Sequence, residues 1–161
     1  MKRKQFGQTS LEVSLLTFGC GAVGGLMTKG SSEDQDRAVA WARDNGINHF
    51  DTAPSYGDTI SETNLGRALG TNREGIIVST KVGFSQSELE DVNTATQNSL
   101  NASLQRLRQD HVDICQLHNT IDDSGEEGTV TLNQVINDVL PAFIKIREQG
   151  LSLIHISEPT R

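Results

Sequence analysis

The chain has 161 residues, a formal net charge of −7 and 35% hydrophobic residues, the ordinary composition of one globular domain with its own core. The acidic balance argues against a nucleic-acid partner, and no apolar run approaches the ~18 residues of a membrane span. Cys20 and Cys115 are far apart and lack metal-ligand spacing, and no signal peptide precedes them, so we expect a cytoplasmic protein without a disulfide framework or a metal site.

The first elements are a hairpin and a strand. Residues 3–13 read as a small hairpin, because Gly7 to Ser10 is turn material between two short runs. Leu15 to Phe18 is an apolar run and is the candidate first buried strand. A glycine-rich loop from Gly19 to Ser32 follows it.

That loop contains Gly19-Cys20-Gly21-Ala22-Val23-Gly24, which matches the G-x-G-x-x-G fingerprint of dinucleotide-binding folds. The fingerprint requires its third glycine in the first turn of a helix. The residues after Gly24 are poor helix formers, and a capping box at Ser32 to Gln35 places the helix start near Ser32. This context disfavours the dinucleotide-binding interpretation. The segment is then either a plain glycine-rich strand-to-helix loop or a loop that lets a ligand come close to the backbone.

Helices and short apolar strands then alternate. We expect a helix from Glu33 to Asn45 with Trp41 in the core, and a final helix from about Leu132 to Glu148 that Pro141 bends or splits. The other expected elements are strands at 47–50, 76–78 and 112–117, helices at 60–69 and 92–108, and an acidic loop at 119–128. This order predicts a parallel sheet, either doubly wound or a barrel. A (β/α)8 barrel needs about 250 residues, so a barrel here is half of one.

The last residues, 151–161, have two interpretations. Leu151, Leu153 and Ile156 fit part of a fifth strand. The string Leu151 to Arg161 also looks like a translated sequencing-adapter read-through. We favour the second interpretation, with a domain at 1–150 and a non-native tail at 151–161.

Four polar residues follow three of the predicted strands. Asp51 and Tyr56 lie in the stretch Asn48 to Gly57, Lys81 follows the third strand and His118 follows the fourth. Each alone has an ordinary interpretation, as a turn residue, a packed aromatic, a solvated charge or a loop histidine. Their joint occurrence at strand ends favours an active site instead, because both candidate folds place their sites there.

The stretch Asn48 to Gly57, with Lys81 and His118 each ending a strand, gives the chain a resemblance to the aldo-keto reductase family over residues 3–150. The resemblance implies the N-terminal half of a (β/α)8 TIM barrel preceded by a β-hairpin that caps its bottom. It also implies a nicotinamide cofactor, usually NADP(H) and in some relatives NAD(H). The catalytic tetrad would be Asp51, Tyr56, Lys81 and His118. The expected cofactor contacts are Gly19, Cys20, Gly21 and Asp51.

Carbonyl reduction needs a hydride at carbon and a proton at oxygen. A free tyrosine, with a pKa of about 10, is a slow proton donor unless its phenolate is stabilised. The expected roles are therefore Tyr56 as general acid, Lys81 as its electrostatic activator and Asp51 as the group that orients Lys81. His118 would orient the substrate carbonyl or share in proton transfer.

Three interpretations of the function remain open. The first is an oxidoreductase acting on a small carbonyl or alcohol, whether a sugar, an aliphatic aldehyde or a steroid-like ketone. The second is a regulatory subunit on the same fold, as in relatives that assemble with ion channels. The third is a non-functional fragment. Because the family's main cofactor loops lie in the later strands, we expect this 161-residue product to be inactive or nearly so. We also expect it to self-associate or aggregate through its open first and fourth strands.

Overall fold

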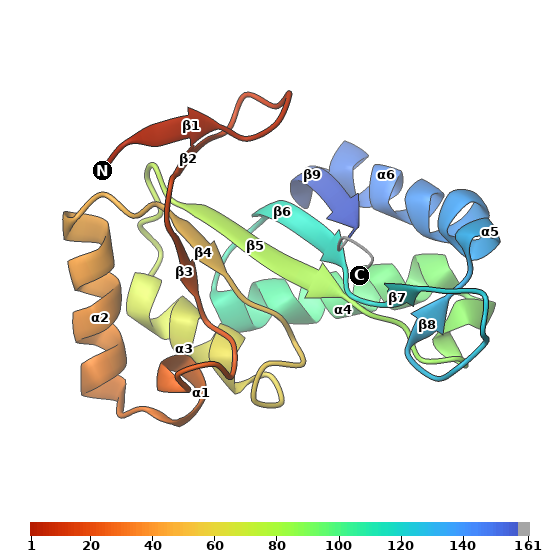
Figure 1. The fold of residues 1–161 in the computed structure, drawn as a ribbon, viewed down its shortest axis with the longest axis horizontal. Helices are drawn as coiled ribbons and strands as arrows, with labels where there is room; N and C mark the ends of the chain where they lie inside the picture. The colour runs from red at the N-terminus through yellow and green to blue at the C-terminus, as the bar shows by residue number, and fades with distance from the viewer. Residues whose placement is uncertain (158–161) are drawn as a thin grey trace.

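A computed structural model describes residues 1–157, with side chains described as far as Ile154. A hairpin of antiparallel strands, β1 (Arg3–Gln5) and β2 (Glu12–Ser14), precedes a five-stranded parallel sheet (Figure 1). The sheet order is β3 (Thr17–Gly19), β4 (His49–Asp51), β5 (Ile77–Val82), β6 (Val112–Leu117) and β9 (Ser152–Ser157).

Helices connect the successive strands. They are α1 (Leu26–Lys29), α2 (Ser32–Asp44), α3 (Ile60–Leu69), the 3-10 turn η1 (Glu88–Glu90), α4 (Val92–Leu107), α5 (Leu132–Gln134), the π-helical turn η2 (Val135–Val139) and α6 (Leu140–Glu148). Two short parallel strands, β7 (Thr120–Ile121) and β8 (Thr129–Val130), lie at the start of the acidic loop and directly after its end. A doubly wound sheet reverses its strand order, whereas this sheet follows chain order throughout. The predicted half-barrel behind a hairpin is therefore confirmed.

The core lies between the sheet and the helices of its outer layer. Phe50 and Val78 are register partners on neighbouring strands and are fully buried, as is Leu65 of α3. Gly66 stands where α3 crosses α4, and a Cβ there would lie 2.3 Å from the backbone oxygen of Arg106. Only glycine permits this close approach of the two helices without a shift of backbone.

Helix α2 departs from the prediction in two details. Its N-cap is Ser31 rather than Ser32, and the Ser31 hydroxyl accepts a hydrogen bond from the backbone N–H of Asp34. Trp41, predicted as core, is 62% exposed. The buried positions are Gln35, Val39 and Ala42, which share a face at helical spacing, and Trp41 lies one residue off that face.

The last helix is divided, as predicted. The π-helical turn η2 interrupts it just before Pro141, which then stands in the first turn of α6, where its missing N–H costs nothing. Gly150 ends the helix with a positive φ of 74°.

Strand β9 corrects one expectation. It pairs in parallel with β6, so the edges of the sheet are β3 and β9, and the prediction that the fourth strand is an edge is wrong. Residues 152–157 thus adopt the fifth strand that was the less favoured interpretation. The non-native origin of residues 151–161 stays a prediction, and 158–161 lie outside the described residues.

The hairpin lies at the amino ends of the strands (Figure 1). The Asn48 side chain fixes it there, accepting from the Ser14 N–H and donating to the Glu12 carbonyl. Across residues 1–157, no helix combines the length and apolar character needed to cross a bilayer.

Candidate active site

The four candidate catalytic residues come together at the carboxyl edge of the sheet. Asp51 ends β4 and Lys81 is the penultimate residue of β5. Tyr56 lies in the turn after β4, and His118 directly follows β6. Parallel strands in register bring their carboxyl ends to one side, so residues far apart in sequence become neighbours.

Lys81 is the centre of this cluster. Its side chain is 3% exposed, and its Nζ donates to Asp51 Oδ1 at 3.0 Å, to Asp51 Oδ2 at 2.9 Å and to the Thr52 carbonyl at 3.1 Å. These three acceptors match the three protons of an ammonium group. The same Nζ lies 4.9 Å from the centre of the Tyr56 ring, within cation–π range. These contacts fix the lysine side chain against the aromatic ring.

Tyr56 and His118 form the upper part of the cluster. Their ring centres lie 5.9 Å apart in an edge-to-face arrangement. The Ser55 hydroxyl lies 3.4 Å from His118 Nδ1, at the long end of hydrogen-bond range. The Tyr56 phenol and the His118 imidazole thus lie side by side, next to the buried ammonium group of Lys81.

The candidate cofactor residues line the end of β3, beside the tetrad. The Cys20 N–H donates to the Asp51 carbonyl at 2.9 Å. A Cβ at Gly21 would lie 3.4 Å from Tyr56 Cε2, whereas one at Gly19 would meet open space. Gly24 and Gly25 have positive φ and only a four-residue helix follows, so the loop does not form the dinucleotide fingerprint.

The two cysteines are buried and free. Burial raises the pKa of the Cys115 thiol to about 12, and burial followed by the Asp51 charge raises the pKa of Cys20. Both thiols are therefore protonated at neutral pH and act as small apolar residues, as predicted for Cys115.

Sequence reasoning missed Gln116. It is the register partner of Lys81 and precedes His118 by two residues, so the three side chains share the inner face of the sheet. Its Oε1 is buried, and no group in the described part of the chain donates to it. A polar residue within the apolar run of β6, in phase with His118, was the signal in the sequence. Such an acceptor fits a ligand that carries N–H or O–H donors.

A second polar network supports Lys81 from the helix side. Glu62 of α3 has a fully buried side chain. It accepts from the Thr80 hydroxyl at 2.5 Å and from Arg106 Nε at 2.6 Å. The network joins α3, β5 and α4 directly behind the residue that carries the ammonium group. It was not foreseen, because its members lie 18 and 44 residues apart in sequence.

His49 provides a pH-dependent test of the fold. Its ring contacts the Thr17 and Ser79 hydroxyls across three strands, and burial lowers its pKa below the ordinary 6.5, against the opposing effect of Asp51. The native state therefore holds it neutral, while the unfolded chain takes up a proton below about pH 6.5. We expect the free energy of unfolding to fall on acidification below that pH, by at most about 1.4 kcal/mol per pH unit from this group.

Urea unfolding at several pH values between 5 and 7.5 measures this slope. His49→Gln should flatten it. His111→Gln, in the helix-to-strand loop, measures separately the contribution of a histidine whose ring pairs with Asp110. An unchanged slope in His49→Gln would contradict the assignment.

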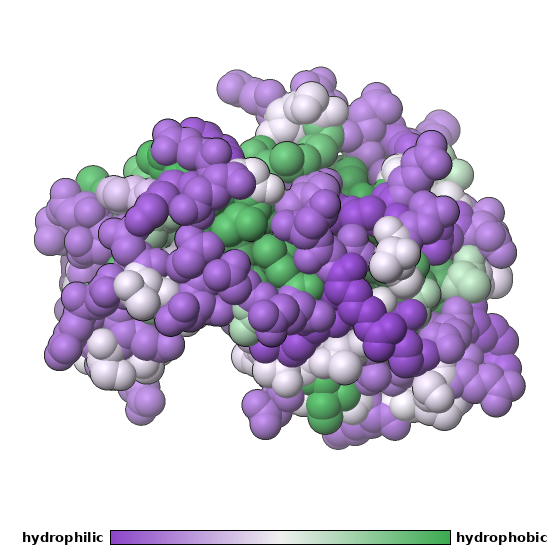
Figure 2. Space-filling view, turned by 180° about the vertical axis from the view of Figure 1, so that it is seen from behind, coloured by the Kyte–Doolittle hydropathy of each residue, from purple (hydrophilic) through white to green (hydrophobic). Residues whose placement is uncertain are grey.

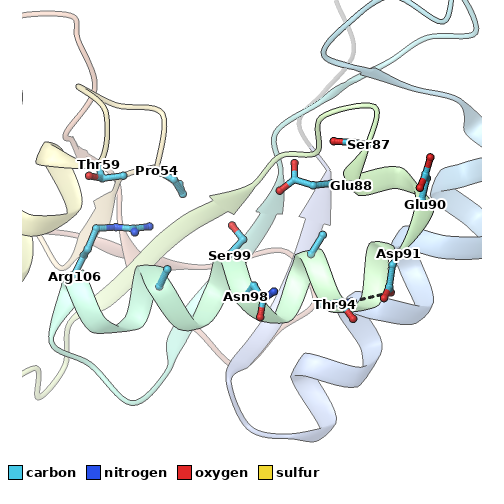
Figure 3. Close-up of a pocket in the computed structure, with 12 residues that line it drawn as sticks. Pro54, Thr59, Ser87, Glu88, Glu90, Asp91, Thr94, Asn98, Ser99 and Arg106 are labelled. Carbon is cyan, nitrogen blue, oxygen red and sulfur yellow. Dashed lines mark hydrogen bonds between the residues drawn. The ribbon is translucent and has the colours of Figure 1, made fainter.

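A groove of about 530 Å³ runs along the outer side of α4 (Figure 3). Glu88, Glu90 and Asp91 stand at one end and Arg106 at the other. None of the four candidate catalytic residues lines it. The groove is lined by α4 and by residues of the loops that follow β4 and β5, and the candidate catalytic residues lie outside it.

The model of the Aldo/keto reductase family matches residues 15–154. The L-galactose dehydrogenase of Arabidopsis thaliana is 34% identical over 150 residues, which cover 91% of this chain and 45% of that protein. A probable voltage-gated potassium channel subunit beta of the same plant is 32% identical over 147 residues, 85% of this chain and 43% of that protein.

A solved structure of the same family has a similar fold. The holo form of aldo-keto reductase AKR11C1 from Bacillus halodurans superposes with a TM-score of 0.79 and 28% identity, over 98% of this chain and 50% of that one. The chain therefore spans about half the length of the proteins it matches.

Proposed function

Because this chain belongs to the aldo-keto reductase family, whose members are generally NAD(P)H-dependent oxidoreductases, we propose that the full-length protein containing it interconverts a small carbonyl compound and its alcohol. The observation that carries the proposal is the arrangement of Lys81. Its Nζ is held by both Asp51 oxygens and lies 4.9 Å from the Tyr56 ring.

The proposed roles follow from these contacts. Tyr56 donates the proton to the developing alkoxide, and the ammonium group of Lys81 stabilises the phenolate left behind. Asp51 orients the ammonium group of Lys81, and the Thr52 carbonyl accepts a hydrogen bond from the third N–H of that group. His118, edge-on to Tyr56, orients the carbonyl or shares in the proton transfer. All four groups are in position before substrate arrives, so little reorganisation is needed.

The residues present fit a nicotinamide cofactor, NADP(H) or NAD(H). Gly19 leaves open space at the end of β3, and the unpaired Gln116 oxygen is an acceptor that a carboxamide N–H would satisfy. Gly19, Cys20, Gly21 and Asp51 would hold the ring side of the cofactor. When bound, the cofactor supplies the hydride.

We further propose that the 161-residue chain alone is inactive or nearly so. Five strands form an open sheet, and a ligand that sits at the strand ends of a barrel needs the walls that further strands and loops provide. The alternative function is a regulatory subunit on the same fold, which similarity to proteins named as potassium channel beta subunits favours.

The test begins with the gene, read across and beyond codon 150. A frame that continues into further strand and helix units gives the full-length protein, which is assayed for cofactor oxidation with aldehydes, ketones and sugars. Carbonyl-dependent turnover by that protein, and none by the 161-residue chain, is the expected result. Cofactor binding without turnover in either direction would favour the regulatory alternative. A stop directly after Arg161 would remove the proposed parent enzyme.

A further inference from the structure

Ser61, the second residue of α3, joins segments that follow two neighbouring strands. Its hydroxyl donates to the Cys20 carbonyl at 2.8 Å, and the Thr52 hydroxyl lies 2.9 Å from the same Ser61 oxygen. The Ser61 backbone N–H donates to the Tyr56 carbonyl at 3.2 Å. Cys20 follows β3, whereas Thr52 and Tyr56 follow β4. One residue therefore holds three points of the loops that carry the candidate active site.

The number of protons fixes the direction of these hydrogen bonds. A serine hydroxyl has one proton, and that of Ser61 is directed at the Cys20 carbonyl. The Thr52 hydroxyl therefore donates to Ser61 Oγ. Ser61 and Thr52 are both fully buried, so neither belongs to the largely hydrophilic face that Figure 2 shows. Water cannot replace a hydrogen bond that either hydroxyl loses.

Thr52 connects Ser61 with the ammonium group of Lys81. The Thr52 N–H donates to the Ser79 carbonyl at 3.0 Å, and the Thr52 carbonyl accepts from Lys81 Nζ at 3.1 Å. Thr52 is thus anchored to β5 by its N–H and to α3 by its hydroxyl. Without the second anchor, the Thr52 carbonyl is free to turn away from Lys81. The ammonium group would then keep only the two oxygens of Asp51.

We propose that Ser61 is a positioning residue, which acts through Thr52 to fix the ammonium group of Lys81 and through its own N–H to fix the loop that carries Tyr56. The residues of this network lie on or directly after three consecutive strands and on the helix α3 between two of them. The consequence for catalysis rests on the proposed function. The effect on Lys81 does not, and it is measurable in the 161-residue chain itself.

Hydrogen exchange at the Lys81 ammonium group tests the proposal. The chain has five lysines, and the other four are exposed, namely Lys2, Lys4, Lys29 and Lys145. In chain labelled at the lysine nitrogens, NMR near neutral pH should therefore detect slowly exchanging Nζ protons for Lys81. In Ser61→Ala we expect these protons to exchange about tenfold faster, the factor that corresponds to one hydrogen bond. Unchanged exchange in the folded variant would overturn the proposal.

Ser14→Ala is the matched control. Ser14 is also buried, and its hydroxyl also makes two hydrogen bonds, donating to the Leu16 carbonyl and accepting from the Asn48 N–H. It ends β2, beside the amino ends of the sheet strands (Figure 1). Both variants should lose stability, but Ser14→Ala should leave exchange at Lys81 as it is. An equal change in the two variants would mean that Ser61 has a structural role alone.

Thr52→Val keeps the test decisive if Ser61→Ala does not fold. Valine has nearly the shape of threonine, and the hydrogen bond from Ser61 to the Cys20 carbonyl stays in place. The substitution removes the hydroxyl that anchors Thr52 to α3. The Nζ protons of Lys81 should again exchange faster, and an unchanged rate would contradict the proposal.

Kinetics of the full-length protein test the consequence for catalysis. Ser61→Ala should lower kcat about tenfold and change KM little, because the alignment of Lys81 and Tyr56 matters in the transition state. An unchanged kcat in an active full-length protein would contradict the positioning role. If the unmodified protein had no carbonyl-dependent turnover, the proposed function would fail, while the exchange measurement on Lys81 would still decide whether Ser61 fixes that group.

Discussion

Replacing Tyr56 by phenylalanine is expected to lower kcat/KM for carbonyl reduction by the full-length protein about a thousandfold, the range for loss of a general acid. The substitution removes one hydroxyl and keeps the ring that packs over Lys81 and against His118. The fold and cofactor binding should therefore change little, while the proton donor is lost. Steady-state kinetics with an aldehyde or ketone identified in the activity screen measures the effect.

Two further variants separate chemistry from structure. Lys81→Met should also cost about a hundredfold or more, because the cation that stabilises the phenolate is lost. Thr63→Ala also removes a hydroxyl, from the exposed side of α3, and should leave kcat/KM within a factor of two or so. If Tyr56→Phe retained a tenth or more of the activity, the assignment of Tyr56 as general acid would be wrong.

Arg106→Met is expected to lower the free energy of unfolding of this chain by about 3–5 kcal/mol, the cost of leaving a buried charge without its partner. The Glu62 side chain is fully buried, and Arg106 Nε is its cationic partner at 2.6 Å. With the arginine gone, the carboxylate either stays charged in an apolar environment or takes up a proton. Both outcomes lower the free energy of unfolding, and the native ion pair avoids that cost.

Urea unfolding of the 161-residue chain measures this effect, with two comparisons. Adding Glu62→Gln to Arg106→Met should restore part of the loss, because an amide carries no charge and still accepts from Thr80. Arg37→Met breaks an exposed ion pair with Asp34 and should cost at most about 1 kcal/mol. Equal losses in Arg106→Met and Arg37→Met would mean that the buried pair has no special role.

Local patterns predicted most of the elements. Helix α3 begins and ends at the predicted residues, Ile60 and Leu69, because its apolar spacing stops at Gly70, which caps it. Strand β6 likewise matches its apolar run. The wrong predictions for α2 arose because its local sequence pattern fits two arrangements. Ser31 and Ser32 both suit an N-cap, and the face of α2 that becomes buried depends on how the helix docks.

For the candidate site, the sequence supplied the residue types and their places at strand ends. Side chains that follow parallel strands meet at one edge, so Asp51, Lys81 and His118 were expected to be neighbours. The contacts themselves were not predictable. The Thr52 carbonyl as third acceptor for Lys81, and the unpaired Gln116 oxygen, depend on packing between strands.

The sequence by itself determined the alternation of strands and helices, the turn positions and the four polar residues, because hydrophobic period and turn chemistry are properties of short segments. Only the tertiary structure decided that Lys81 holds both Asp51 oxygens, 30 residues away, and that Arg106 meets Glu62, 44 residues away. It also decided that residues 152–157 extend the sheet as β9. These outcomes depend on which segments pack together, because each interaction gains its free energy only after the intervening chain has been ordered.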